Sequence, residues 1–181
     1  MPEDSGHLAR LDADYRRVRR MGFPEVRESL GWRTCEGPQG FDFSRLHACM
    51  QAARRQGLEI RWTLMHYGVP AGLDLFDGDD EVFVARFAAF CSAAATALSI
   101  WPVQRPRIYT PINELSFLCW AATCSGLIHP HVGDRAEDAA RLKQRLVRAA
   151  LAGCHAIRAA PPRAPAVRPT SSVPRGAARP R

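Results

Sequence analysis

Two segments of the chain repeat one order, in which a helical pattern is followed by a glycine and then by an apolar strand pattern. Gly22 and Gly57 each separate a predicted helix from a predicted strand, and the strands cover residues 24–29 and 58–66. Glycine suits this position because it tolerates the left-handed backbone that often ends a helix. Helices that alternate with strands in this way are typical of parallel sheets. The chain is therefore predicted to be an α/β protein.

The rest of the chain extends this order. Apolar spacing predicts helices over residues 12–21, 44–56, 81–99 and 134–160, and a third strand within residues 107–114. Asp12 is predicted to cap the first helix, and residues 1–10 to be poorly ordered. A loop is expected over residues 32–40, and a short helix or an ordered loop over residues 115–125.

Composition predicts one domain followed by a tail. The chain has 181 residues and a net charge of +7, and the arginines of residues 161–181 account for +5 of it, which leaves +2 for residues 1–160. This is an ordinary balance for a globular domain. Residues 161–181 are rich in Pro and Arg and lack apolar periodicity, which predicts a disordered tail. The tail alone would attract nucleic acid only non-specifically, so no specific nucleic-acid partner is expected.

The predicted location is the cytoplasm. Six cysteines are present without a CxxC pair, which favours reduced thiols over a disulfide framework. The acidic first residues do not resemble a signal peptide. No uninterrupted run of about eighteen apolar residues is present, so no membrane span is expected.

Polar side chains stand at the ends of all three predicted strands. The first strand carries Arg27 and Glu28, the second ends at His66, and the third ends at Asn113 and Glu114. In a parallel (β/α)8 barrel, side chains at the carboxyl ends of the strands line the active site. Three strands are too few to close such a barrel, which needs eight. The fold class is therefore predicted to be a partial (β/α)8 TIM barrel over residues 1–160.

The segments around these strand ends resemble the family 1 glycoside hydrolases, the β-glucosidase-like enzymes. The resemblance rests on three motifs in the family's order: Val26-Arg27-Glu28-Ser29 with Trp32, Trp62 to Pro70, and Thr110 to Glu114. It implies that the chain supplies about strands two to four of the barrel. It also implies a carbohydrate (glycoside) substrate and hydrolysis of O-glycosidic bonds, without a cofactor.

The resemblance gives each strand-end residue a role. Glu114 is similar to the family's general acid/base, which needs a raised pKa of the kind that partial burial near another carboxylate provides. Asn113 would contact the sugar 2-hydroxyl, and His66 other hydroxyls of the same sugar. Arg27 would orient the nucleophilic carboxylate. Trp120 is a weaker candidate for a sugar subsite, since an aromatic residue there is more often part of a core.

One carboxylate that the family uses has no counterpart in the sequence. A retaining glycosidase needs a nucleophile about 5–5.5 Å from its acid/base, and in the family that residue lies on strand seven. The available acids follow other segments: Glu28, Glu36, Asp74, Asp77, Asp79 and Asp80. Two hypotheses follow. Either a complementing chain or an oligomer supplies the nucleophile, or the chain is a catalytically inactive, truncated or frame-shifted barrel that serves as a remnant or an interaction module.

Other chemistries are less favoured. His129 and His131 with Cys124 could begin a metal site, but a fixed geometry and a carboxylate ligand are missing, so no metal is expected. No cysteine stands at a strand end beside a histidine, as a thiol nucleophile would require. His155 is expected to be a packing residue on its helix.

Overall fold

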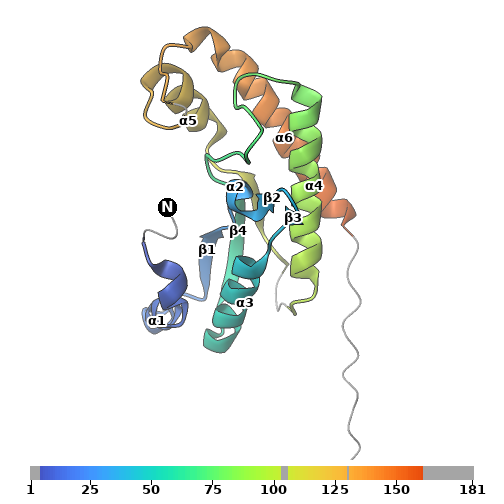
Figure 1. The fold of residues 1–181 in the computed structure, drawn as a ribbon. Coiled ribbons are helices and arrows are strands. Elements are labelled where there is room, and N and C mark those ends of the chain that lie inside the picture. The colour runs from blue at the N-terminus through green and yellow to red at the C-terminus, as the bar shows by residue number, and fades with distance from the viewer. Residues whose placement is uncertain (1–4, 103–105, 130, 161–181) are drawn as a thin grey trace, which may run out of the picture.

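A three-stranded parallel sheet forms the centre of the molecule (Figure 1). The computed structural model describes residues 5–102, 106–129 and 131–160. The strand order is β1 (Glu25–Ser29), β4 (Glu59–Met65) and β5 (Tyr109–Ile112), so the three predicted strands are neighbours. The Cα atom of Ser29 is level with that of Thr63, which is level with that of Thr110. The carboxyl ends of the strands therefore meet at one edge.

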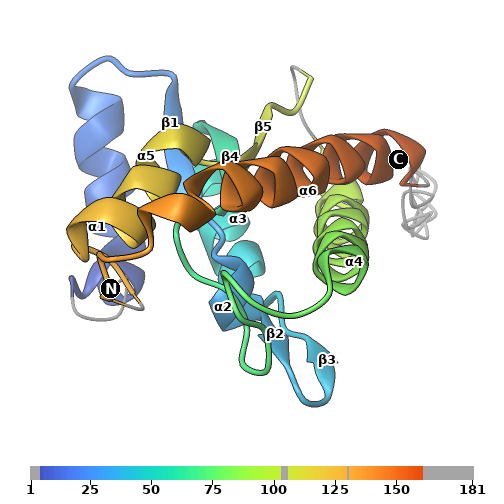
Figure 2. The ribbon, with the colours of Figure 1, turned by 90° about the horizontal axis from the view of Figure 1, so that it is seen from above.

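The four long helices arise from the predicted amphipathic segments. They are α1 (His7–Arg20), α3 (Ser44–Gln56), α4 (Asp80–Ser99) and α6 (Ala139–Ala159). The most extensive helix pairs are α4 with α6 and α1 with α3. In Figure 2 α6 passes across α4, while α1 lies to the left, beyond the β1 edge of the sheet. Helices thus cover one face of a sheet that forms part of a barrel wall.

The two faces of the sheet have different chemistry, because successive side chains on a strand point to opposite sides. Ile60, Trp62 and Leu64 are buried on the face that packs against the helices. The other face carries Arg61, whose guanidinium forms two hydrogen bonds to the Glu25 carboxylate at 2.7 and 2.8 Å. This ion pair is exposed, so the inner face of the partial barrel is polar and open at Arg61, whereas Thr63 and Met65 further along the same face are buried.

Residues 32–40 are more ordered than the predicted loop. They contain α2 (Trp32–Cys35) and an antiparallel hairpin of β2 (Glu36–Gly37) and β3 (Gly40–Phe41). Trp32 is fully buried, and its ring lies against Phe83 and Phe87 of α4 at centroid distances of 5.3 and 5.0 Å. Burial of this large aromatic ring fixes the segment, which is why the loop prediction was wrong.

The start of the described chain also differs from the prediction. The first helix begins at His7 rather than near Asp12, so residues 7–10 are helical. Asp12 does not cap the helix but accepts two hydrogen bonds from Arg55 of α3, each 2.8 Å long. The predicted disordered tail, residues 161–181, lies outside the described residues.

Residues 115–125, which follow β5, are helical throughout. They contain α5 (Leu115–Trp120) followed by a π-helical turn (Ala121–Ser125), and a 3-10 turn (Ala136–Asp138) precedes α6.

Of the described helices, α4 alone is long and apolar enough to cross a membrane by length and composition. Its seven buried residues, three of them phenylalanines, form part of the core instead. All six cysteines are free thiols.

Candidate active site

The strand ends are joined by a chain of hydrogen bonds that begins at Arg27. Its Nε donates to Thr63 Oγ1 at 2.8 Å, and its Nη2 donates to Asn113 Oδ1 at 2.6 Å. Because the Asn113 oxygen accepts from the guanidinium, its Nδ2 is the atom that donates onward to the Tyr67 hydroxyl, at 3.3 Å. Side chains from all three strands are thus connected across the carboxyl edge of the sheet.

Glu114 completes this chain of contacts. The Tyr67 hydroxyl donates to Glu114 Oε2 at 2.6 Å. Both residues have left-handed backbones, with φ of 66° at Tyr67 and 45° at Glu114. Such backbones cost on the order of 1 kcal/mol for residues other than glycine. Two strained residues that meet through one hydrogen bond are typical of a site in which side-chain direction matters.

The environment of Glu114 differs from the expected one. Partial burial near another carboxylate was predicted, but Glu114 is exposed and its hydrogen-bond partner is the phenol of Tyr67. β5 is an edge strand of the sheet, so no further strand of the described chain lies beside it to bring a carboxylate near Glu114. In this structure Glu114 is a solvated carboxylate held in a fixed direction.

His66 lies beside this network without joining it by a hydrogen bond within the described residues. Its ring is 4.3 Å from that of Tyr67, centroid to centroid. Burial and the positive charge of Arg27 lower the pKa of His66, and the Glu114 carboxylate opposes this shift. A neutral imidazole at an exposed position can donate to or accept from a hydroxyl group.

Tyr67 was not among the residues predicted for the site. Burial, followed by the hydrogen bond to Glu114, raises the pKa of its phenol, so Tyr67 is a donor at neutral pH. Its place immediately after His66, at the end of the same strand, is the sequence signal that could have identified it.

An exposed aromatic surface continues from Tyr67 onto α5. Phe117 lies 5.6 Å from Tyr67 and 5.7 Å from Trp120, measured between ring centroids. Phe117 is 41% exposed and Trp120 is 49% exposed. Trp120 is therefore not part of the core, although the sequence favoured a core role for an aromatic residue at this position. Exposed rings beside polar groups offer an apolar surface on which a sugar ring can stack.

The acids considered as a second catalytic carboxylate have structural partners. Glu28 points away from Arg27 and accepts from Tyr15 at 2.8 Å, and His7 contacts it at 3.1 Å. Glu36 accepts from the Trp32 indole and from Arg86. The four aspartates lie in the β4–α4 loop or at the first residue of α4, where they bind backbone amides or arginines: Asp74, Asp77, Asp79 and Asp80. Each of these six acids is held by its own surroundings.

Metal and thiol chemistry find little support in the described residues. No group of three or more His, Cys, Asp or Glu side chains within the described ranges could hold a metal ion. His131 instead contacts the Gly126 carbonyl oxygen at 3.0 Å, and Pro130 lies outside these ranges. Burial raises the pKa of Cys35 and of Cys49 to about 11, which disfavours a thiolate. His155, expected to be a packing residue, is exposed.

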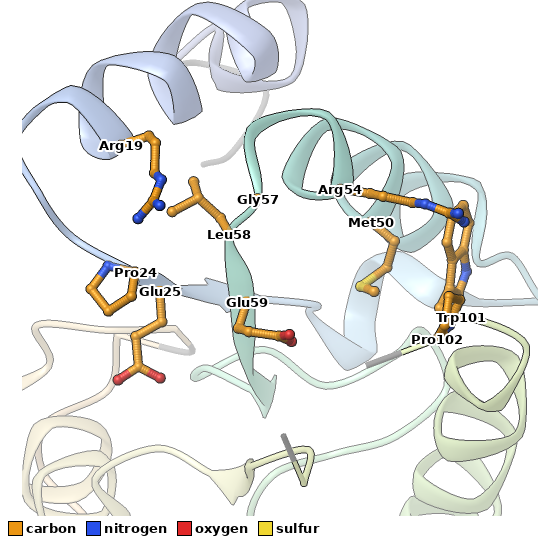
Figure 3. Close-up of a pocket in the computed structure, with 10 residues that line it drawn as sticks. All are labelled: Arg19, Pro24, Glu25, Met50, Arg54, Gly57, Leu58, Glu59, Trp101 and Pro102. Carbon is orange, nitrogen blue, oxygen red and sulfur yellow. The ribbon is translucent and has the colours of Figure 1, made fainter. Parts of the chain in front are cut away.

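A cavity lies at the amino ends of the strands, opposite the edge that carries Glu114 (Figure 3). Its volume is about 450 Å³, and Pro24, Glu25, Leu58 and Glu59 from the strand starts line it. Arg19 and Arg54 stand in the last turns of α1 and α3, where cations offset the negative ends of the helix dipoles. This position accounts for both arginines, and the amino ends of barrel strands are not where active sites form.

Comparisons with known proteins give the fold a precedent. No protein-family model and no curated protein sequence matches the chain. Among solved structures, the family 1 β-glucosidase from Thermotoga maritima superposes with a TM-score of 0.71 at 20% identity, over 85% of this chain and 35% of that one. The chain has the fold of part of a β-glucosidase barrel.

Two further structures agree with this β-glucosidase-like fold. The AHE enzyme from Alicyclobacillus herbarius has a TM-score of 0.73 at 17% identity, over 86% of this chain and 35% of that one. The T. maritima β-glucosidase in complex with glucoimidazole has a TM-score of 0.72 at 20% identity, with 85% and 35% covered. This chain therefore spans about a third of the length of the structures it matches. The predicted partial TIM barrel is confirmed.

Proposed function

We propose that the carboxyl edge of the sheet binds a glycoside and that Glu114 is the acid/base group for cleavage of its O-glycosidic bond. The observation that carries this proposal is the hydrogen-bonded series from Arg27 through Asn113 and Tyr67 to Glu114. It aligns an amide and a carboxylate at the edge where barrel enzymes bind substrates. The T. maritima β-glucosidase of the same fold forms complexes with glucoimidazole and deoxynojirimycin, which supports a sugar-shaped ligand.

Each residue has one part in this function. Glu114 protonates the leaving glycosidic oxygen and later accepts a proton from water. Asn113 contacts the sugar 2-hydroxyl, a hydrogen bond that strengthens as positive charge develops on the ring. His66 contacts other hydroxyls. Arg27 fixes the Asn113 amide, and its remaining N–H groups are donors for orienting an incoming carboxylate.

The second carboxylate comes from outside the described residues. The six acids considered above are engaged in structural contacts, so turnover requires a complementing chain, an oligomer or further sequence that brings a nucleophile. The carbohydrate substrate is the principal partner. We also propose a cytoplasmic location, on the basis of the six free thiols.

Single-turnover hydrolysis of an aryl β-glycoside tests this function. Purified chain is compared with Glu114→Gln, in the presence and absence of azide as an external nucleophile. We expect azide-dependent release of the aryl group, reduced at least about 100-fold by the substitution. Glu28→Gln is a matched control, because it changes an equivalent charge on the other side of β1. Equal rates for Glu114→Gln and the unsubstituted chain would refute a catalytic role for Glu114.

The alternative is a catalytically inactive partial barrel, either a non-enzymatic remnant or an interaction module. The engagement of all six candidate acids favours it. Its signature is saturable binding of a glycoside without aryl release, even at high protein concentration with azide.

A further inference from the structure

A cavity of about 240 Å³ adjoins the site through Tyr67, and its walls combine apolar side chains with an arginine and a histidine. Val69, Leu73 and Leu75 form the apolar wall, and Arg33 and His129 supply nitrogen donors. None of the described residues that line the cavity is acidic. A small apolar pocket with a few converging polar groups is the usual form of a ligand site.

The Arg33 guanidinium is available for a ligand. Within the described residues the Arg33 side chain is exposed and forms no hydrogen bond or ion pair. Glu36, three residues after Arg33, binds Trp32 and Arg86 instead, and Asp74 of the β4–α4 loop accepts from the amides of Phe76 and Asp77. An arginine without a carboxylate beside an apolar cavity favours an anion.

The position of Arg33 is set by Gly68. A Cβ atom at Gly68 would lie 3.2 Å from Arg33 Cβ and 3.4 Å from its Cδ, so the arginine stem rests on the bare glycine backbone. Because Gly68 directly follows Tyr67, this contact brings the Arg33 stem next to the end of β4, where Tyr67 donates to Glu114. His129 reaches the same cavity from the segment after α5.

We infer that this cavity binds an anionic substituent, a carboxylate or a phosphate, of the glycoside held by Asn113 and Glu114. The inference rests on the proposed function and adds the substrate class. Arg33 pairs with two oxygens of the anion, and His129 donates a further hydrogen bond. The apolar wall contacts the body of the substituent, and Tyr67 separates the anion from the Glu114 carboxylate.

The test is an NMR titration of the full, ¹⁵N-labelled chain at fixed low salt. The probes are methyl β-glucoside, methyl β-glucuronide and methyl β-glucoside 6-phosphate. We expect at least one anionic probe to bind about tenfold more tightly than the neutral one. The two anionic probes distinguish a carboxylate from a phosphate. Equal affinity for all three probes would overturn the inference while leaving the glycoside site intact.

Variants separate the cavity from general charge attraction. Arg33→Gln should remove the advantage of the anionic probe and leave the glucoside affinity unchanged. Gly68→Ala keeps the charge but displaces the Arg33 stem, so it should reduce the same advantage. Arg17→Gln, an equal charge change on the exposed face of α1, should have no effect, and an equal loss in this variant would also overturn the inference.

The failure of the proposed function has a different signature. If no glycoside binds but inorganic phosphate binds in a manner that depends on Arg33, the cavity is an anion site and the glycoside assignment falls. If the neutral glucoside shifts the amide resonances of Asn113 and Glu114 while the anions add nothing, the glycoside site holds and the anion inference falls. The NMR spectrum of each variant also reports whether it is folded.

Discussion

Arg145 and Arg27 show how one side-chain type serves two regions of the molecule differently. Arg145 on α6 is 1% exposed, and its guanidinium forms five hydrogen bonds in the β4–α4 loop. The acceptors are the Asp80 carboxylate and the carbonyl groups of Asp74, Leu75, Asp77 and Gly78. Arg27 lies at the exposed strand ends and forms two hydrogen bonds, to Thr63 and Asn113. Every nitrogen of the buried Arg145 guanidinium is engaged within the protein, whereas the exposed Arg27 has no hydrogen bond from its Nη1 among the described residues.

The difference concerns what each region must do. The β4–α4 loop has carbonyl groups that would be unpaired in a dry interior, and Arg145 satisfies them. The strand ends instead keep polar groups that are fixed in direction and open to water. Burial and the number of internal partners therefore separate a structural charge from one that can meet a substrate.

The largest effect is expected for Arg145→Met. Methionine keeps much of the apolar stem but removes all five hydrogen bonds, and it leaves Asp80 and four carbonyl groups without their donor. We expect a loss of about 3–5 kcal/mol in the free energy of unfolding, measured by urea denaturation. Arg158→Met, at an exposed position on the same helix, should change it by less than about 0.5 kcal/mol. A similar loss in both variants would contradict the structural role of Arg145.

A smaller loss of stability is expected for Gly153→Ala. Gly153 lies where α6 packs closely against α4, the contact that also positions Arg145. The added Cβ would lie 2.8 Å from Cys91 Sγ and 3.1 Å from Phe87 Cε1. We expect a loss of about 1–2 kcal/mol, because overpacking outweighs the gain in helix propensity. In a double-mutant cycle, Cys91→Ala should recover part of this loss. Additive losses would show that the helices separate freely.

The sequence predicted the elements of the sheet well and the surroundings of the site less well. Apolar spacing and the positions of Gly22 and Gly57 indicated three parallel strands, because both signals act within one helix or strand. The Asn113-Glu114 pair indicated the end of β5, because this signal also lies within one short segment. Contacts between distant residues were not predictable in this way. The bond from Tyr67 to Glu114 joins residues 47 positions apart, and the exposure of Glu114 depends on which strands are present.

The ordering of the first helix was missed for a similar reason. His7 contacts Glu28, 21 residues further along the chain, and this contact holds a segment whose own composition gives little helical signal. The buried Trp32 likewise orders residues that read as a loop, through rings on α4. In both cases tertiary packing outweighed local preference.

Arg27→Gln tests the other half of the comparison. The substitution removes both hydrogen bonds at an exposed site, so we expect a loss of only about 1 kcal/mol in the free energy of unfolding. Because Asn113 loses the donor that fixes its amide, glycoside affinity should fall about tenfold. Urea denaturation and NMR titration with methyl β-glucoside measure the two effects. A large loss of stability with unchanged affinity would place Arg27 in the same class as Arg145.

The smallest effect is expected on the outer face of β1, where His7 contacts Asp14 at 2.7 Å and Glu28 at 3.1 Å. Burial lowers the pKa of His7, but the hydrogen bonds and charges of these two acids outweigh it, so the pKa is raised above 6.5. The protonated imidazole therefore stabilises the folded state fully below about pH 6.5. This contribution is lost as the pH rises through the higher folded-state pKa.

Comparison with His7→Gln isolates this contribution. The unsubstituted chain should be about 0.5 kcal/mol more stable than the variant at about pH 5.5, and the difference should vanish by about pH 8.5. Urea denaturation of both proteins across this range measures it. The opposite slope would mean that His7 is buried as a neutral ring. In that case the His7 ring would add no positive charge beside Glu28. The two faces of β1 would then differ, with a neutral histidine on the outer face and the charged Arg27 on the inner face.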